Sequence, residues 1–402
     1  MTKWKTTCLV VGGGPAGMML AYLLARSGVQ TILVEKHGDF LRDFRGDTVH
    51  PSTTELMHEL GILDEFLRDV PHQTMNQLGI GFKGQTFDLV DFRHLPTACK
   101  YVVFMPQWDF LNFLADKAKR YPAFRLERNT EVTGLLWDDD RVVGVTAQTA
   151  SGSLEIHADV TVACDGRWSV VREQSGLPVK EFAMPIDVLW FRLPRADSAP
   201  ETLGYLGAGQ IVIAINRGDY WQCGTIIDKG GFETVKADGL PTFRSRVAAA
   251  APFLATSLEA LTDWDQVKLL AVRANRLRQW WLPGLLCIGD AAHAMSPVGG
   301  IGVNYAIADA VAAANSLAGP LQNGRVVDDH LRAVQKRRQT PTKVAQFLQR
   351  AQTANLARLS KTDPPLWILR FLTHSAPVKR LLGRTMGLGF RREHIRSGVA
   401  PD

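Results

Sequence analysis

Residues 6–17 read TTCLVVGGGPAG, and this stretch decides how the N-terminal part of the chain folds. Its first six residues are apolar or β-branched, a composition typical of a buried strand. A glycine-rich turn follows, and the apolar run Met18–Ala25 predicts a buried helix that ends near Gly28. Gln30–Glu35 then has the composition of a second strand. The stretch therefore predicts a β-α-β unit with a right-handed crossover.

The glycine spacing in the turn, Gly12-x-Gly14-x-x-Gly17, favours dinucleotide binding over an ordinary strand-to-helix turn. The first glycine permits the tight turn, the second lets the backbone approach a pyrophosphate, and the third lets helix and strand pack closely. Glu35, at the end of the second strand, can accept hydrogen bonds from both ribose hydroxyls of an adenosine and would repel a 2′-phosphate. The contacts predicted here are Gly12, Gly14, Pro15, Ala16, Gly17, Glu35 and Lys36.

Two further segments follow apolar strands. CDGRWSVVR occupies 164–172 after the strand-like residues 160–163, and GDAAH occupies 289–293 after Leu285–Ile288. The second segment continues through a proline- and glycine-rich loop into a helix that begins after Gly302. Together with the N-terminal fingerprint, these motifs resemble the group A aromatic-hydroxylase family of flavoprotein monooxygenases, typified by para-hydroxybenzoate hydroxylase. The resemblance extends from Cys8 to about Ala318.

The resemblance implies FAD as the bound cofactor and assigns roles to the matching residues. Asp165 and Gly166 match a motif that contacts both FAD and the passing nicotinamide nucleotide, although Asp165 could instead only cap the following helix. Asp290 matches the acid that hydrogen-bonds the ribityl chain, a role that suits an ionised carboxylate. His293 could be a catalytic base, but the pattern favours a helix-start contact near phosphate. Cys164 is interpreted as a small core residue.

The loop from Pro297 to Gly302 matches the one that passes the reactive edge of the isoalloxazine. Pro297 and Gly299 are therefore flavin-edge candidates, while no catalytic base is identified. N–H groups at the start of the following helix could stabilise negative charge on the reduced flavin. The other cofactor contacts implied by the resemblance are Gly289, Gly300, Gly302, Val303 and Asn304, with Arg45 and Gln107 as looser matches. No pattern makes His50 or His58 a ligand, so both are expected to be structural or exposed.

The expected fold is α/β, a Rossmann-type FAD-binding domain with an inserted, mostly antiparallel β-sheet substrate domain and C-terminal helices. Short alternating segments place the insertion at 179–264, so the FAD-binding domain comprises 1–178 and 265–325, and 326–402 is helical. Trp190, Arg192 and Trp221 in the insertion are candidates for lining a pocket for a flat, apolar substrate. Equally, such aromatic side chains could fill the core of the sheet.

Composition narrows the remaining possibilities. Five scattered cysteines with no Cys-x-x-Cys pair argue against a zinc site or a disulfide framework, and no apolar run is long enough for a membrane span. The N-terminus lacks the pattern of a signal peptide, so we expect a cytoplasmic protein, monomeric or homodimeric. The net charge of +6 could suit a nucleic-acid partner, but its dispersed basic residues favour a merely basic surface. The basic amphipathic segment 378–384 could contact a membrane surface, although packing on the flavin domain or a dimer partner is favoured.

The resemblance implies a single-component monooxygenase. NADH or NADPH would reduce FAD, and a flavin C4a-hydroperoxide formed with O₂ would hydroxylate an aromatic small molecule, phenolic or heteroaromatic. The absence of a second Gly-x-Gly-x-x-Gly unit fits a nicotinamide nucleotide that visits the flavin transiently. A reductase or dehydrogenase of the same superfamily, or a flavin-binding protein without catalysis, remain alternatives. The sequence leaves open the substrate, the preferred nicotinamide nucleotide and the oligomeric state.

Overall fold

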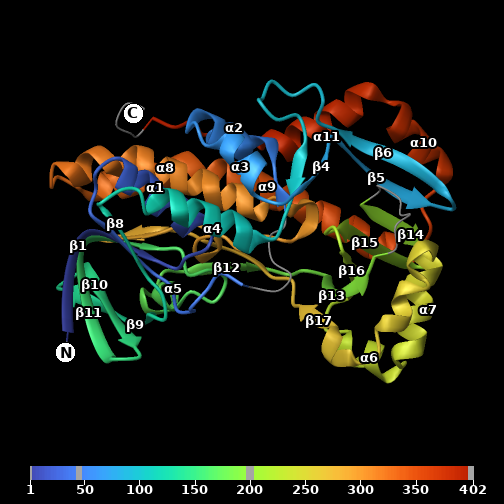
Figure 1. The fold of residues 1–402 in the computed structure, drawn as a ribbon, viewed down its shortest axis with the longest axis horizontal. Coiled ribbons are helices and arrows are strands. Elements are labelled where there is room, and N and C mark those ends of the chain that lie inside the picture. The colour runs from blue at the N-terminus through green and yellow to red at the C-terminus, as the bar shows by residue number, and fades with distance from the viewer. Residues whose placement is uncertain (1, 42–47, 196–202, 397–402) are drawn as a thin grey trace.

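The computed structural model describes residues 2–41, 48–195 and 203–396. Its larger sheet has eight strands, in the order β19-β20-β11-β1-β2-β8, with β10 and then β9 added through β11 (Figure 1). The strands are β1 (Thr2–Val11), β2 (Thr31–Val34), β8 (Phe124–Glu127), β9 (Glu131–Asp138), β10 (Arg141–Thr149), β11 (Gly152–Ala163), β19 (Trp281–Leu282) and β20 (Leu285–Cys287).

The core of this sheet is parallel and buried. β1 pairs in parallel with β2 and β11, and β11 pairs in parallel with β20. Parallel strands covered by helices are apolar throughout, which explains the continuous apolar run at the end of β1. Helices α1 (Pro15–Arg26), α4 (Gln107–Ala118) and α8 (Gly302–Gln322) lie over one face of the sheet (Figure 1). The predicted α/β class with a Rossmann-type first unit is confirmed.

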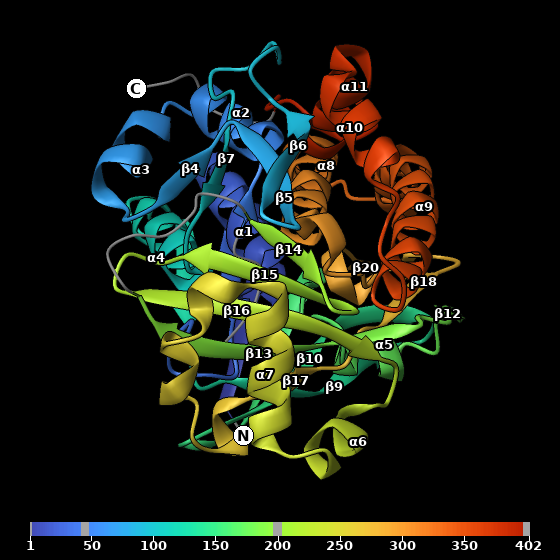
Figure 2. The same ribbon diagram turned by 90° about the vertical axis from the view of Figure 1, so that its right-hand side faces the viewer.

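A second sheet of seven strands has the order β17-β13-β16-β15-β14-β5-β6, and only the β14–β5 pair is parallel. The strands are β5 (Gln77–Phe82), β6 (Gln85–Asp91), β13 (Ile186–Pro194), β14 (Gly204–Gly207), β15 (Gln210–Asn216), β16 (Tyr220–Asp228) and β17 (Lys268–Leu270). Helices α6 (Phe232–Ala237) and α7 (Leu240–Ala250) lie against one side of it (Figure 2). Strands β5, β6 and β17 lie outside the predicted insertion at 179–264, yet they join this sheet. The domain boundaries drawn from the sequence stay a prediction.

Smaller elements complete the fold. They are the sheet β3-β7-β4 (Thr48–Val49, Val102–Phe104, Gln73–Met75), the ribbon β12–β18 (Val179–Phe182, Ala274–Leu277), helices α2 (Pro51–Glu59), α3 (Leu63–Asp69) and α5 (Val170–Gln174), and short 3₁₀ turns at Pro252–Leu254, Ser257–Ala260, Trp264–Gln266, Gly289–Ala291 and Val298–Gly300.

The C-terminal part is helical, as expected. It consists of α9 (Asp328–Leu359), α10 (Leu366–His374) and α11 (Ala376–Leu388). The glycine at 383 packs directly on β6, since a Cβ there would collide with the Asp91 backbone. The basic segment 378–384 therefore packs on the molecule, whereas Trp367 and Phe371 of α10 are 71% and 63% exposed. Within the described ranges, no helix combines the length and the apolar character needed to cross a membrane.

Candidate functional site

The three sequence motifs meet at the carboxyl edge of the parallel sheet. The N–H groups of Gly12, Cys164 and Ile288 each donate to a carbonyl at the end of the neighbouring strand, over 2.8, 2.7 and 3.0 Å. These bonds join the ends of β2, β1, β11 and β20 in spatial order. In open α/β sheets ligands bind at this edge, outside the carboxyl ends of the strands.

The glycine-rich loop packs closely on one side and is open on the other. Gly12 has φ +101°, and a Cβ there would lie 2.7 Å from the Cys164 carbonyl oxygen. A Cβ on Gly17 would collide with the Gly12 carbonyl oxygen. At Gly14, by contrast, no described atom lies within 4 Å of the position a Cβ would take. The loop thus forms a backbone-lined cradle at the N-terminus of α1, which suits an anionic group.

Glu35 is fixed beside this cradle. Its Oε2 accepts a hydrogen bond from the Gly13 N–H at 2.9 Å, and its Oε1 accepts one from the His37 N–H at 3.1 Å. The carboxylate therefore lies at the glycine loop, where a ribose next to a bound pyrophosphate could reach it. Lys36 is exposed. Arg45, the looser match, lies outside the described residues.

Asp165 uses only one of its two carboxylate oxygens. Oδ2 accepts from the Val171 N–H at 3.3 Å, while Ser169 caps α5 by accepting from the Arg172 N–H at 2.9 Å. Oδ1 is buried and has no hydrogen-bond partner among the described residues. Burial raises the pKa of Asp165. Helix capping therefore accounts for one oxygen, and the other is a buried acceptor next to Gly166 that a hydroxyl or N–H of a ligand would satisfy.

Arginines of the second motif hold the third. Arg167 Nε donates to Asp290 Oδ2 at 3.0 Å, and Arg172 Nη1 donates to the Ala291 carbonyl at 3.2 Å. Asp290 stays half-buried, so its carboxylate remains accessible at the edge of the sheet. The sequence predicted no role for either arginine, and their place directly after Asp165 was the available signal.

The loop before α8 depends on two glycines in the left-handed region. Gly299 has φ +79° and Gly300 has φ +61°, and a Cβ on Gly300 would collide with the Thr48 hydroxyl. That hydroxyl donates to the Gly300 carbonyl at 3.0 Å. Gly302 and Val303 then begin a 21-residue helix, whose N-terminus carries a positive dipole end. Pro297 comes just before this loop and is half-buried.

The Asn304 side chain is engaged by the protein itself. Its Oδ1 accepts from the His50 N–H at 2.9 Å and the Thr53 hydroxyl at 2.7 Å, and its Nδ2 donates to the Thr48 and Gly300 carbonyls at 3.2 and 3.3 Å. The residue therefore ties the loop from Pro297 to Gly302 to β3 and α2. A direct cofactor contact through the Asn304 side chain stays a prediction.

His50 is buried under the same loop, which makes it structural. Its Nδ1 lies 3.0 Å from the Met386 carbonyl oxygen in α11. Burial lowers the pKa of His50 to about 4, although backbone hydrogen bonds partly oppose this shift.

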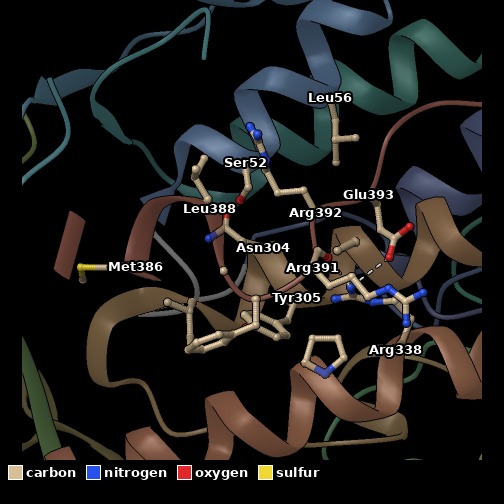
Figure 3. A pocket seen from close by; sticks show the side chains of 15 residues that line it. Ser52, Leu56, Asn304, Tyr305, Arg338, Met386, Leu388, Arg391, Arg392 and Glu393 are labelled. Atoms are coloured by element: carbon tan, nitrogen blue, oxygen red, sulfur yellow. Dashed lines mark hydrogen bonds and ion pairs between the residues drawn. The ribbon is translucent and has the colours of Figure 1, made fainter. Parts of the chain in front are cut away.

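A buried ionic network lies behind the Gly289–Asp290 turn. Asp309 of α8 accepts from the Gly289 N–H at 3.1 Å and from Arg338 Nε at 2.8 Å, and lies 2.5 Å from His293 Nε2. Burial alone would raise the pKa of Asp309, but His293 and Arg338 outweigh burial and lower it. Arg338 in turn pairs with Glu393 at 3.2 Å (Figure 3).

This network alters the interpretation of His293, whose ring is buried against Asp309 and Trp280 rather than placed at a helix start. The sequence reasoning missed Asp309 and Arg338. An aspartate in an otherwise apolar helix was the available signal. A small cavity of about 30 Å³ adjoins the network, lined among others by Ser52, Asn304 and Arg338 (Figure 3).

The three substrate candidates do not share one face of the second sheet. Trp190 belongs to the cluster that includes Phe104 and Leu388, on the side of α11. Trp221 is buried on the opposite side, with its ring centroid 5.5 Å from that of Phe253. The reason is strand alternation: Leu193, not Trp190, is opposite Trp221 in the register. The exposed Arg192 has its guanidinium 5.2 Å from the Tyr220 ring.

Gln107 is the first residue of α4, directly after Pro106, and is half-buried. Asp109, in the same first turn, has its pKa raised by burial. These two polar side chains begin the helix that covers the sheet beside α1, and a contact of Gln107 with a cofactor stays a prediction.

Comparisons with known proteins agree with this geometry. A model of the FAD binding domain family matches residues 5–348. The chain is 31% identical over 399 residues to the 6-methylpretetramide 4-monooxygenase of Streptomyces rimosus, covering 98% of this chain and 95% of that protein. It is 28% identical over 392 residues to the dialkyldecalin synthase of Streptomyces rugosporus, covering 95% and 80%.

The fold is also found in a solved structure. The anhydrotetracycline hydroxylase OxyS of Streptomyces rimosus superposes with a TM-score of 0.78 at 21% identity, covering 99% of this chain and 78% of that one. The family match spans most of the chain and includes every motif at the carboxyl edge of the sheet. The chain therefore belongs to the FAD-binding family of flavoprotein aromatic monooxygenases.

Proposed function

We propose that this protein is a single-component monooxygenase that uses NADH or NADPH and O₂ to hydroxylate a phenolic or heteroaromatic small molecule. The observation that carries the proposal is the convergence of the glycine cradle, the buried Asp165 Oδ1 and the Asp290 turn at one edge of the sheet. The residues present fit FAD, because an open backbone cradle and a buried acceptor without a partner are what a dinucleotide would satisfy.

Each motif would hold a different part of FAD. The cradle from Gly12 to Gly17 would bind the pyrophosphate, Glu35 the adenosine ribose and Asp290 the ribityl hydroxyls. Gln107 and the loop from Pro297 to Gly302 would contact the flavin ring system. When bound, FAD supplies the hydride acceptance and oxygen activation that no amino-acid side chain provides.

Besides holding FAD, the chain would position the substrate beside the cofactor and exclude water from the site. The α8 N-terminus, at Gly302 and Val303, would stabilise negative charge on the pyrimidine side of the reduced cofactor. The face of the second sheet that carries Trp190 is apolar and adjoins α11, so it suits an aromatic ring. Arg192 lies at the rim of that sheet and could meet a substrate anion.

The relatives narrow the substrate class. One relative is named as a monooxygenase of 6-methylpretetramide. A solved structure with the same fold is named as a hydroxylase of anhydrotetracycline. We therefore propose a fused-ring phenol as the first substrate to test, followed by simple phenols and quinolone-type heterocycles. The dialkyldecalin synthase shows that the name of a relative at 28% identity need not describe an oxygenation, so the test must detect reactions without oxygen transfer.

The test uses FAD-loaded protein with NADH or NADPH and each compound, in air and without oxygen. We expect nicotinamide oxidation stimulated by the substrate and a product that gains one oxygen atom, labelled when ¹⁸O₂ is supplied. Turnover that continues without oxygen and adds two hydrogens would instead identify a reductase. A product of unchanged mass would indicate an isomerisation or cyclisation, and either result would refute the proposal.

A further inference from the structure

Four cationic side chains surround an open surface cavity. They belong to segments distant in sequence from the glycine-rich loop at 12–17. Lys180 comes from β12, Arg276 and Arg278 from β18 and the turn after it, and Lys343 from α9. The cavity has a volume of about 240 Å³ and is completed by Leu277 and Gln339. Figure 2 shows α9 beside β18 and β12, which places segments from three parts of the chain around it.

These cations have no acidic partner within the described chain. Arg276 donates to the neutral Gln346 Oε1 at 2.8 Å, and none of the four forms an ion pair with a described carboxylate. Some surface lysines elsewhere do have an acidic partner, such as Lys3 with Glu155 at 2.9 Å. Glu181, the sequence neighbour of Lys180, accepts instead from Asn275 Nδ2 at 3.1 Å.

Holding like charges together is unfavourable unless an anion lies between them. Arg276 is half-buried, and burial lowers the pKa of its guanidinium. Its guanidinium carbon lies 5.4 Å from the Phe182 ring centroid, so an aromatic contact restrains the side chain. A restrained guanidinium with ammonium groups around it matches the oxygens of a phosphate.

We propose that this cavity binds the phosphate group of a small anion, separately from the FAD pyrophosphate. The cavity holds several water-sized volumes of roughly 30 Å³ each, enough for a phosphate or a pyrophosphate. The proposal does not depend on the reaction proposed above. The phosphate could be free or carried by a nucleotide, and the two sources share the same recognition chemistry.

The test is calorimetric titration of the FAD-loaded protein with pyrophosphate, because bound FAD then fills the glycine cradle. The variant pair K180Q/K343Q removes two exposed charges and should leave the fold intact. We expect pyrophosphate to bind about tenfold more weakly to this variant than to the wild type. The control K100Q/K268Q removes two other exposed lysines, lowers net charge equally and should bind as the wild type does.

A second titration with 2′,5′-ADP distinguishes the sources. Tighter binding than pyrophosphate, lost in K180Q/K343Q, supports a nucleotide phosphate, whereas binding no tighter than pyrophosphate and lost in the same variant supports a free phosphate. Binding should also weaken as salt is raised, because the site is at the surface. The proposal is overturned if pyrophosphate does not bind, if K180Q/K343Q binds it as the wild type does, or if the control pair loses as much affinity.

Discussion

Replacing Gly14 with alanine separates the folding role of the glycine loop from its binding role. Gly14 has φ −73° and ψ −177°, which alanine adopts without strain, and open space lies where its Cβ would be. Alanine gains about 0.4–1 kcal/mol by restricting the unfolded chain. As the residue before α1 it loses a similar amount, because glycine is preferred to alanine at a helix N-cap. The free energy of unfolding without FAD should therefore change by less than about 1 kcal/mol.

Affinity for FAD should respond very differently. If a pyrophosphate lies against Gly14, the methyl group takes its place and pushes the phosphate away from the helix N–H groups. Loss of one hydrogen bond to a charged group costs about 1.5–3 kcal/mol, or roughly 10- to 150-fold in Kd. Fluorescence titration of the apoprotein with FAD measures this loss, and urea unfolding of the same sample measures stability.

Gly12→Ala is the matched comparison. Its Cβ would lie 2.7 Å from the Cys164 carbonyl oxygen and 2.8 Å from the Asp165 Cα, at a φ of +101°. Both atoms belong to backbone that cannot rotate away, so this variant should lose stability and FAD affinity together. An unchanged Kd in Gly14→Ala would refute the reasoning, since it would mean that no phosphate approaches the open side of the loop.

Three further predictions concern the side chains of Asp290, Asp309 and His50. Asp290→Asn should weaken FAD binding about tenfold in the same titration, while the free energy of unfolding changes by less than about 1 kcal/mol because its pair with Arg167 is partly open to solvent; an unchanged Kd would exclude the ribityl contact. Asp309→Asn removes one of the two carboxylates that pair with the buried Arg338 and should lower the free energy of unfolding by about 3–5 kcal/mol, whereas a loss below about 1 kcal/mol in urea would contradict the network. His50 has a folded pKa of about 4 against 6.5 for the free side chain, so the unfolded chain takes up the proton first as pH falls. Stability should be full above about pH 6.5 and decline by up to about 3 kcal/mol toward pH 4, and His50→Gln should remove that part of the slope in urea melts at several pH values.

The local chemistry of the site could be predicted because its signals lie within short stretches. A glycine spacing after an apolar strand specifies a turn, and the run from Thr6 to Gly17 contains both parts. The same holds for the segments at Asp165 and Asp290, each directly after a strand. Their meeting at one edge follows from the parallel order of β1, β11 and β20, which the motifs imply once they are recognised as one family.

The substrate face could not be predicted in the same way. Trp190 and Trp221 are both aromatic residues in strands, yet strand register turns them to opposite sides of the sheet. Register depends on which residues pair across strands, and composition does not record that pairing.

The sequence by itself determined the nucleotide-binding unit, the order of the three motifs and the family, because these depend on residues close together in the chain. Only the tertiary structure decided that Asp309 supports the Gly289 turn and that Asn304 and His50 hold the loop from Pro297 to Gly302. It also decided that four cations, none with an acidic partner among the described residues, gather between α9 and the β12–β18 ribbon. The physical reason is that such contacts join residues separated by tens to hundreds of positions. Their energies depend on burial and on the distance between charges, which exist only once the chain has folded.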